Sequence, residues 1–257
     1  MPFSNAVILA DADNTLWDTD ALFADAQLTL LQAVNPSFVA SARDKALEHV
    51  RRYDQAIARI DHRHLRYPPS LLVHALSLGA EGQSAEQAAL AVTQSAAGRG
   101  APEGLVEETV ARYLEMLSRQ PDLLPGVREG LAAARAQSVD VWILTEGAAE
   151  KQRERAKFLG IATLIKGVSE AAKTREQFKR QQRRFAPAQL YVIGDQPDRD
   201  IAPAREAGCI AVLVAGRFRP GWISEAEWSA ADHVAETFDR AVAWVLAGTE
   251  IPQAMTR

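Results

Sequence analysis

The sequence predicts an α/β fold in which a parallel-sheet core is interrupted by an inserted all-helical module. Three observations support this fold class: a short apolar strand at 6–10, helical periodicity over 17–119, and apolar runs that alternate with helical segments after residue 120. Strands that alternate with helices are typical of a parallel sheet covered on both faces. We therefore assign 1–16 and 120–257 to a discontinuous core domain and 17–119 to a helical domain.

Five helices are predicted within the helical domain. The first is marked by Leu22, Ala26 and Leu30, which recur at helical spacing, and the third begins at two prolines and is broken by the segment 79–82. The predicted helices are 20–34, 37–60, 68–78, 84–97 and 102–117.

The core domain is predicted to alternate strands with helices. Its apolar runs are typical of strands buried on both faces, and glycines such as Gly160 and Gly208 mark helix ends. The predicted strands are 6–10, 139–144, 163–168, 190–193 and 210–214. The predicted helices are 127–137, 148–159, 174–185 and a short helix that ends before Gly208.

Composition is that of an ordinary globular protein. The 257 residues are 47% apolar and 24% charged with a net charge of −4, so the whole chain lacks the basic character of a nucleic-acid-binding protein. The single cysteine, Cys209, is interpreted as a core residue. The chain has no 18-residue apolar run, and no Lys or Arg precedes its first apolar run. We expect a cytoplasmic protein with neither a membrane nor a nucleic acid as partner.

Polar side chains directly follow three of the predicted strands. Asp11 and Asp13 follow the first, Thr145 the second and Asp195 the fourth. Ligands of open parallel sheets bind outside the carboxyl ends of the strands, so these groups are expected to meet at one edge. Residues two apart in an extended segment share a face, so the carboxylates of Asp11 and Asp13 are expected to lie close together. Two carboxylates at such short range imply a divalent metal or a shared proton.

Four ordered motifs resemble those of the haloacid dehalogenase-like (HAD) superfamily, phosphatase type with a helical C1-type cap. The motifs are 11–15 (DADNT), 144–145 (LT), Lys173 and 194–200 (GDQPDRD). The resemblance implies a Rossmann-like core and makes 17–119 the cap domain. It also implies a hydrolase that cleaves a small phosphomonoester through an aspartyl-phosphate.

The resemblance implies a role for each catalytic residue. Asp11 is the nucleophile, and Asp13 is the general acid for the leaving alcohol and then the base for water. Thr145 donates its hydroxyl to a phosphate oxygen, and Lys173 supplies a fixed positive charge. Lys166 also follows an apolar run and is the alternative to Lys173 for that last role.

The resemblance further implies Mg²⁺ as the cofactor. Asp195 and the Asp11 carboxylate would bind the ion together with the main-chain carbonyl of Asp13. Asp200 would either ligate the ion or hold its water. All of these are hard oxygen ligands, which suit Mg²⁺.

Two alternatives to a phosphatase are compatible with the same four motifs. Asp13 favours a phosphatase over a dehalogenase or a phosphonate-cleaving enzyme, because those branches lack this carboxylate. A phosphomutase of the superfamily, or a non-catalytic protein of the same fold that binds a ligand or partner, remains open. The leaving alcohol and the oligomeric state cannot be inferred from the sequence.

Two features of the chain depart from the family pattern or lie outside it. Glu146 follows Thr145 where the family often has asparagine, and it is expected either to face the N-terminus of the next helix or to pair with a cation. In the helical domain, the segment around Arg63 and His64 is rich in Arg, His and Tyr, which suits an anionic substrate. Arg63 and His64 are the candidates for substrate contact.

Overall fold

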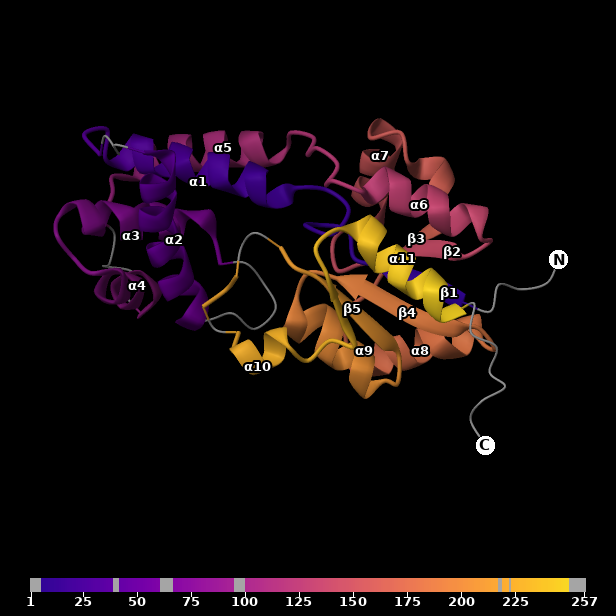
Figure 1. Cartoon of the computed structure of the whole chain (residues 1–257). Coiled ribbons are helices and arrows are strands. Elements are labelled where there is room, and N and C mark those ends of the chain that lie inside the picture. The colour runs from indigo at the N-terminus through magenta and orange to yellow at the C-terminus, as the bar shows by residue number, and fades with distance from the viewer. Residues whose placement is uncertain are drawn as a thin grey trace. The chain divides into compact units, whose positions relative to one another are not determined.

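The computed structural model describes residues 6–38, 42–60, 67–94, 100–216, 219–221 and 223–249. The chain divides into two compact units (Figure 1). The sheet unit comprises 1–19, 120–219 and 223–257, and the helical unit comprises 20–119 and 220–222.

The sheet unit is built on six parallel strands in the order β3-β2-β1-β4-β5-β6. The strands are β1 (Ala6–Ala10), β2 (Asp140–Thr145), β3 (Gly167–Glu170), β4 (Gln189–Gly194), β5 (Ile210–Val214) and β6 (His233–Ala235). This architecture confirms the predicted Rossmann-like α/β fold class. It also makes β1 and β4 neighbours near the middle of the sheet, with Ala10 paired to Ile193.

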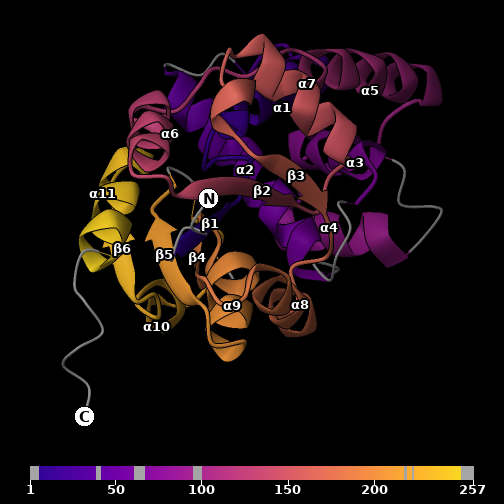
Figure 2. The same ribbon diagram turned by 90° about the vertical axis from the view of Figure 1, so that its right-hand side faces the viewer.

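Helices cover both faces of the sheet, which is why its central strands are apolar throughout. Figures 1 and 2 show α6 and α11 on one face and α8 and α9 on the other. The helices of this unit are α6 (Val127–Ala136), α7 (Ala149–Phe158), α8 (Arg175–Phe185), α9 (Ala202–Glu206), α10 (Glu225–Trp228) and α11 (Phe238–Thr249). Ile8, Ile143 and Ile193 from three strands pack with Leu131 of α6 and Val242 of α11 in one buried core.

The predicted strand at 163–168 is wrong in position. Residues Ala162–Leu164 form a single 3-10 turn, with the Leu164 amide donating to the Ile161 carbonyl at 2.9 Å, and β3 begins only at Gly167. Gly167 pairs with Trp142 of β2, and a Cβ at Gly167 would lie 2.4 Å from the Trp142 ring. The strand therefore starts where a glycine lets it approach this ring.

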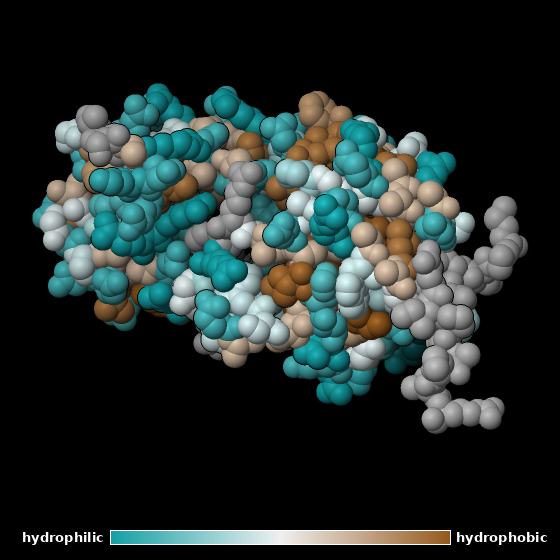
Figure 3. Space-filling view, viewed as in Figure 1, coloured by the Kyte–Doolittle hydropathy of each residue, from teal (hydrophilic) through white to brown (hydrophobic). Residues whose placement is uncertain are grey.

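The helical unit packs five helices around its own core. They are α1 (Thr19–Val34), α2 (Arg43–Ile60), α3 (Pro69–Ala80), α4 (Ala85–Gln94) and α5 (Glu103–Leu117). Leu30, Val50 and Val73 are fully buried in this core, whereas the face seen in Figure 3 is mostly hydrophilic. Helix α2 begins later than predicted, at Arg43, and Phe38 closes a turn onto Asn35 before it. In the described part of the chain, no helix combines the length and apolar character needed to cross a membrane.

Candidate active site

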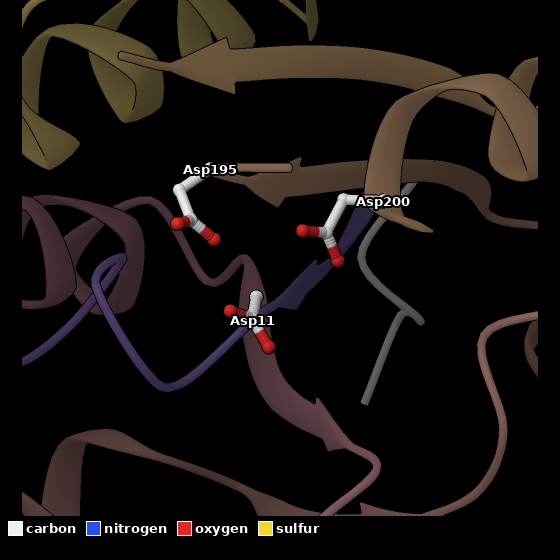
Figure 4. Close-up of side chains that lie close together, drawn as sticks. All are labelled: Asp11, Asp195 and Asp200. Carbon is white, nitrogen blue, oxygen red and sulfur yellow. The ribbon is translucent and has the colours of Figure 1, made fainter. Parts of the chain in front are cut away.

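Asp11 lies at the carboxyl end of β1, where its backbone still belongs to the sheet. Its amide donates to the carbonyl of Ile193 at 2.8 Å, so the β1–β4 hydrogen bonding extends through Asp11. Asp195 directly follows β4 and is therefore beside it (Figure 4). The parallel topology thus brings together two carboxylates that are far apart in the sequence.

Asp11, Asp195 and Asp200 form an acidic cluster whose ligand oxygens all lie within 4.8 Å of one another. All three residues are buried, and Figure 4 shows their side chains converging. Asp200 returns to the strand end on a wide helical turn, Pro197–Ile201, and its Oδ2 accepts from the Gln196 amide at 3.1 Å. Gly194 permits this approach, because a Cβ there would lie 2.3 Å from Cγ of Asp200.

Lys173 supplies the positive charge of this cluster. Its Nζ donates to Asp11 and lies 2.7 Å from Oδ1 of Asp200, and the side chain is 7% exposed. Burial favours the neutral amine, but the Asp11 and Asp200 carboxylates outweigh it and raise the pKa of Lys173. Lys166 instead lies 3.4 Å from Asp140 at the amino end of β2, and its side chain is 62% exposed. Of the two candidate lysines, the structure brings Lys173 to the acidic cluster.

Among the described residues, the single ammonium of Lys173 faces three buried carboxylates, so the acidic cluster favours additional positive charge. Burial raises the pKa of Asp11 to about 7 against the opposing effect of Lys173. Burial, followed by the Asp11 and Asp200 carboxylates, raises the pKa of Asp195 well above its ordinary value. Within the described ranges, Oδ1 of Asp195 is buried and accepts no hydrogen bond. A buried, unpartnered oxygen among carboxylates fits a hard divalent cation such as Mg²⁺.

Thr145, the last residue of β2, is buried with its hydroxyl acting as an acceptor. Oγ1 accepts from the Gly147 amide at 3.0 Å and lies 3.4 Å from Nε2 of Gln152. A hydroxyl oxygen that already accepts from neighbours still has its own hydrogen to donate. Thr145 can therefore donate to an anion at the strand ends.

The carboxylate of Asp13 accepts hydrogen bonds from three side chains that the sequence analysis does not identify. We call Trp17, Gln152 and Arg155 the Asp13 cradle. Trp17 Nε1 and Arg155 Nη1 each donate to Oδ1 of Asp13 at 3.0 Å, and Gln152 Nε2 donates to Oδ2 at 3.2 Å. Asn14, at a φ of 60°, helps to turn the chain so that Trp17 returns to Asp13.

One sequence signal could have identified part of the Asp13 cradle. Gln152 and Arg155 are three residues apart on α7, so they share a face of the first helix after Thr145. Both are buried, which is unusual for a guanidinium and demands a polar partner.

Glu146 pairs with a cation of the core, the second of its two expected roles. Its carboxylate pairs with Arg199 and also accepts from the Lys173 amide at 3.1 Å. The N-terminus of α7 is instead satisfied by Glu170, which accepts from the Ala149 amide at 2.8 Å. Glu146 therefore connects the loops that carry Thr145, Lys173 and Asp200, and its negative charge is compensated there.

The predicted substrate-contact residues, Arg63 and His64, lie outside the described residues. The structure therefore describes the acidic cluster, Lys173, Thr145 and Asp13 at one edge of the sheet unit.

A curated relative shares part of the sequence. The chain is 33% identical over 129 residues to a phosphoserine phosphatase of Thermus thermophilus. The matched region covers 47% of this chain and 51% of the relative. The chain thus matches about half the length of that protein.

Solved structures share the fold over nearly the whole chain. A haloacid dehalogenase-like hydrolase from Xanthomonas campestris has a TM-score of 0.59 at 16% identity, covering 96% of this chain and 92% of its own. A HAD hydrolase from Bacillus subtilis bound to magnesium has a TM-score of 0.58 at 19% identity, with coverages of 94% and 98%. A predicted phosphoglycolate phosphatase from Haemophilus somnus also has a TM-score of 0.58, at 18% identity, with coverages of 95% and 99%.

The family is established by a match along most of the chain. The family model for haloacid dehalogenase-like hydrolases matches residues 6–208, which include every strand-end residue described above. The chain belongs to the haloacid dehalogenase-like hydrolase family.

Proposed function

We propose that the protein is a Mg²⁺-dependent phosphatase that hydrolyses a small phosphomonoester through an aspartyl-phosphate on Asp11. The observation that carries this proposal is the convergence of Asp11, Asp195 and Asp200, in which Oδ1 of Asp195 has no hydrogen-bond partner among the described residues, with Lys173 beside them. The similarity to a phosphoserine phosphatase supports a phosphorylated substrate.

The cation would be held by the carboxylates of the acidic cluster together with the main-chain carbonyl of Asp13. When bound, Mg²⁺ would neutralise phosphate oxygens that would otherwise meet three carboxylates. The magnesium-bound relative from Bacillus subtilis is consistent with this choice of ion.

In the first step, a carboxylate oxygen of Asp11 forms a bond to phosphorus while the bond from phosphorus to the leaving alcohol breaks. Asp13 gives its proton to the departing oxygen. Lys173 holds the Asp11 carboxylate and balances its charge, and the Thr145 hydroxyl donates to a phosphate oxygen.

In the second step, water attacks phosphorus and the bond between phosphorus and Asp11 breaks. Asp13 accepts the proton that water loses, which returns both aspartates to their starting states. The acid and base roles thus fall on one side chain, which lies two residues from the nucleophile but has different neighbours.

We further propose that residues 17–119 act as a cap domain that selects the substrate, with Arg63 and His64 contacting it. Lids of this kind exclude water and set selectivity. Phosphoserine and phosphoglycolate, which are named by the relatives, are the first members of a substrate panel.

Hydrolysis of 4-nitrophenyl phosphate with Mg²⁺ or with EDTA tests the proposal. We expect chelation to abolish turnover, and Asp11→Asn to lower kcat on the order of 10³-fold or more. Asp140→Asn is the matched control, because Asp140 lies at the amino end of β2 and should leave kcat unchanged. Undiminished turnover in EDTA or in Asp11→Asn would refute the mechanism. A sugar phosphate converted to its isomer faster than phosphate is released would identify a phosphomutase.

A further inference from the structure

The Asp13 cradle places an almost buried guanidinium against a half-exposed carboxylate. The Arg155 side chain is 7% exposed, whereas that of Asp13 is 44% exposed. Burial of an unpaired guanidinium is strongly unfavourable, so the contact with Asp13 matters to Arg155 as well. Trp17 and Gln152 are also buried, which fixes the positions of all three donors.

The three donors divide the two oxygens of Asp13 between them. Among the described residues, Oδ1 accepts from both Trp17 and Arg155, whereas Oδ2 accepts from the amide of Gln152 alone. Two hydrogen bonds use both lone pairs of Oδ1, whereas the single hydrogen bond from Gln152 leaves Oδ2 a lone pair that can carry a proton. Oδ2 is therefore the oxygen that remains available for proton exchange.

The cradle is also connected to the phosphate-facing side of the site. Gln152 Nε2 lies 3.4 Å from the Thr145 hydroxyl oxygen while it donates to Asp13. Gln152 and Arg155 share one face of α7, so the orientation of this helix sets both contacts to Asp13. A rigid helix can hold a carboxylate more accurately than a loop can.

We propose that Arg155 and Trp17 are positioning residues, which anchor Oδ1 of Asp13 and leave Oδ2 as the oxygen that exchanges the proton with the leaving alcohol. This inference rests on the proposed phosphatase function. Neither residue touches the substrate in this role: both act through Asp13. Proton transfer to a leaving group is worth about 10²–10⁴ in rate, and it depends on hydrogen-bond geometry.

The leaving-group dependence of kcat/KM tests the role directly. This parameter covers the steps up to departure of the alcohol, and an alkyl phosphate such as phosphoserine needs a proton there far more than 4-nitrophenyl phosphate does. Arg155→Met retains much of the side-chain length but removes the charge and the donors. We expect it to lower kcat/KM about 10- to 100-fold for phosphoserine and less than about 3-fold for 4-nitrophenyl phosphate.

Two variants keep the test decisive if Arg155→Met folds poorly. Trp17→Phe keeps an aromatic ring in the core but removes the indole donor, and Arg155→Lys keeps the charge. We expect Trp17→Phe to show the same selective loss, and Arg155→Lys to restore part of the activity toward phosphoserine. Arg153→Met is the matched control, because Arg153 lies on the same helix, is 47% exposed and pairs with Glu150. It should leave both kcat/KM values unchanged.

A double-mutant cycle separates positioning from a general structural effect. On an Asp13→Asn background, Arg155→Met should lower kcat/KM for phosphoserine less than about 2-fold, because the acid that it positions is already gone. Equal losses on both substrates, or an undiminished loss on the Asp13→Asn background, would overturn the inference. Wild-type turnover that survives EDTA or Asp11→Asn would instead overturn the proposed function, so the two failures are distinguishable.

Discussion

The two units of the molecule treat polar residues in different ways. In the described part of the chain, the buried charged residues Asp11, Arg155, Asp195 and Asp200 all belong to the sheet unit, as does Lys173 with its 7% exposed side chain. The buried polar residues of the helical unit are neutral, Gln27 and Thr109. Transferring a charge from water into the protein interior is unfavourable, and the fold places its buried charges at a single edge of one sheet. The difference indicates where chemistry, rather than packing, dictated the sequence.

Lys173→Met should give the largest loss of stability and turnover, because it removes a charge from the sheet edge that distinguishes the two units. Removing the ammonium leaves the Asp11 and Asp200 carboxylates without their counter-charge, which should lower the free energy of unfolding by about 3–5 kcal/mol. Turnover should fall about 10²- to 10³-fold. Denaturant unfolding and kcat measure the two losses. Lys166→Met removes one partner of an exposed pair with Asp140 and should change neither quantity. Similar losses in this variant would mean that the carboxyl ends of the strands do not differ from the rest of the sheet unit in stability or activity.

Gly194→Ala should give an intermediate effect. The added Cβ would lie 2.3 Å from Cγ of Asp200, so the carboxylate must move, at a cost of about 1–3 kcal/mol of stability. Calorimetric titration with Mg²⁺ should show weaker binding, because one member of the acidic cluster is displaced. Gly104→Ala in α5 meets nothing within 4 Å and should be neutral or slightly stabilising. Unchanged Mg²⁺ affinity in Gly194→Ala would argue against Asp200 as part of a metal site.

Glu146→Gln should have a smaller effect. The substitution removes the ion pair with Arg199, which is partly exposed and therefore worth on the order of 1 kcal/mol or less. An amide oxygen can still accept from the Lys173 backbone, so we expect only a few-fold loss of kcat. A double-mutant cycle with Arg199→Gln isolates the pair. Additive effects in that cycle would show that the two side chains do not act together.

Replacing His49 should give the smallest effect, a change in how the stability of the protein depends on pH, without a change in activity. Burial, followed by the nearby Arg52, lowers the pKa of His49 below 6.5 in the folded protein. The unfolded chain therefore binds the proton more tightly, so stability should be complete above about pH 6.5 and fall as the pH decreases below it. Unfolding free energies at pH 7.5 and 5.5 should differ less for His49→Gln than for wild type. A loss of kcat at pH 7.5 in this variant would break the contrast between the units.

The fold and the strand-end residues could be predicted because both depend on local patterns. Apolar runs identified the central strands, and a parallel sheet places the residues after them at one edge, which brings Asp11 and Asp195 together. The third strand was misplaced because its residues are only partly buried at the sheet edge and its start depends on the Trp142 ring. Nothing local to residue 167 reveals that contact.

The Asp13 cradle could not be predicted in the same way. Trp17 looks like a packing residue, and it is fully buried, but its indole donor also reaches Asp13. Arg155 meets Asp13 only because α7 turns one particular face toward the segment that follows β1. The partner of Glu146 likewise depends on the wide helical turn that carries Arg199. Such contacts between distant segments follow from tertiary packing, which periodicity does not encode.

The backbone of Asp11 has a consequence for dynamics. Its amide donates to the Ile193 carbonyl, so the proposed nucleophile is part of the hydrogen-bonded ladder between two central strands. Groups in such a ladder are exposed to solvent only when the sheet itself opens. The Asp11 amide should therefore exchange its hydrogen as slowly as the amides of Ile8 and Val192, which would make this proposed nucleophile one of the last places in the chain to lose its native order.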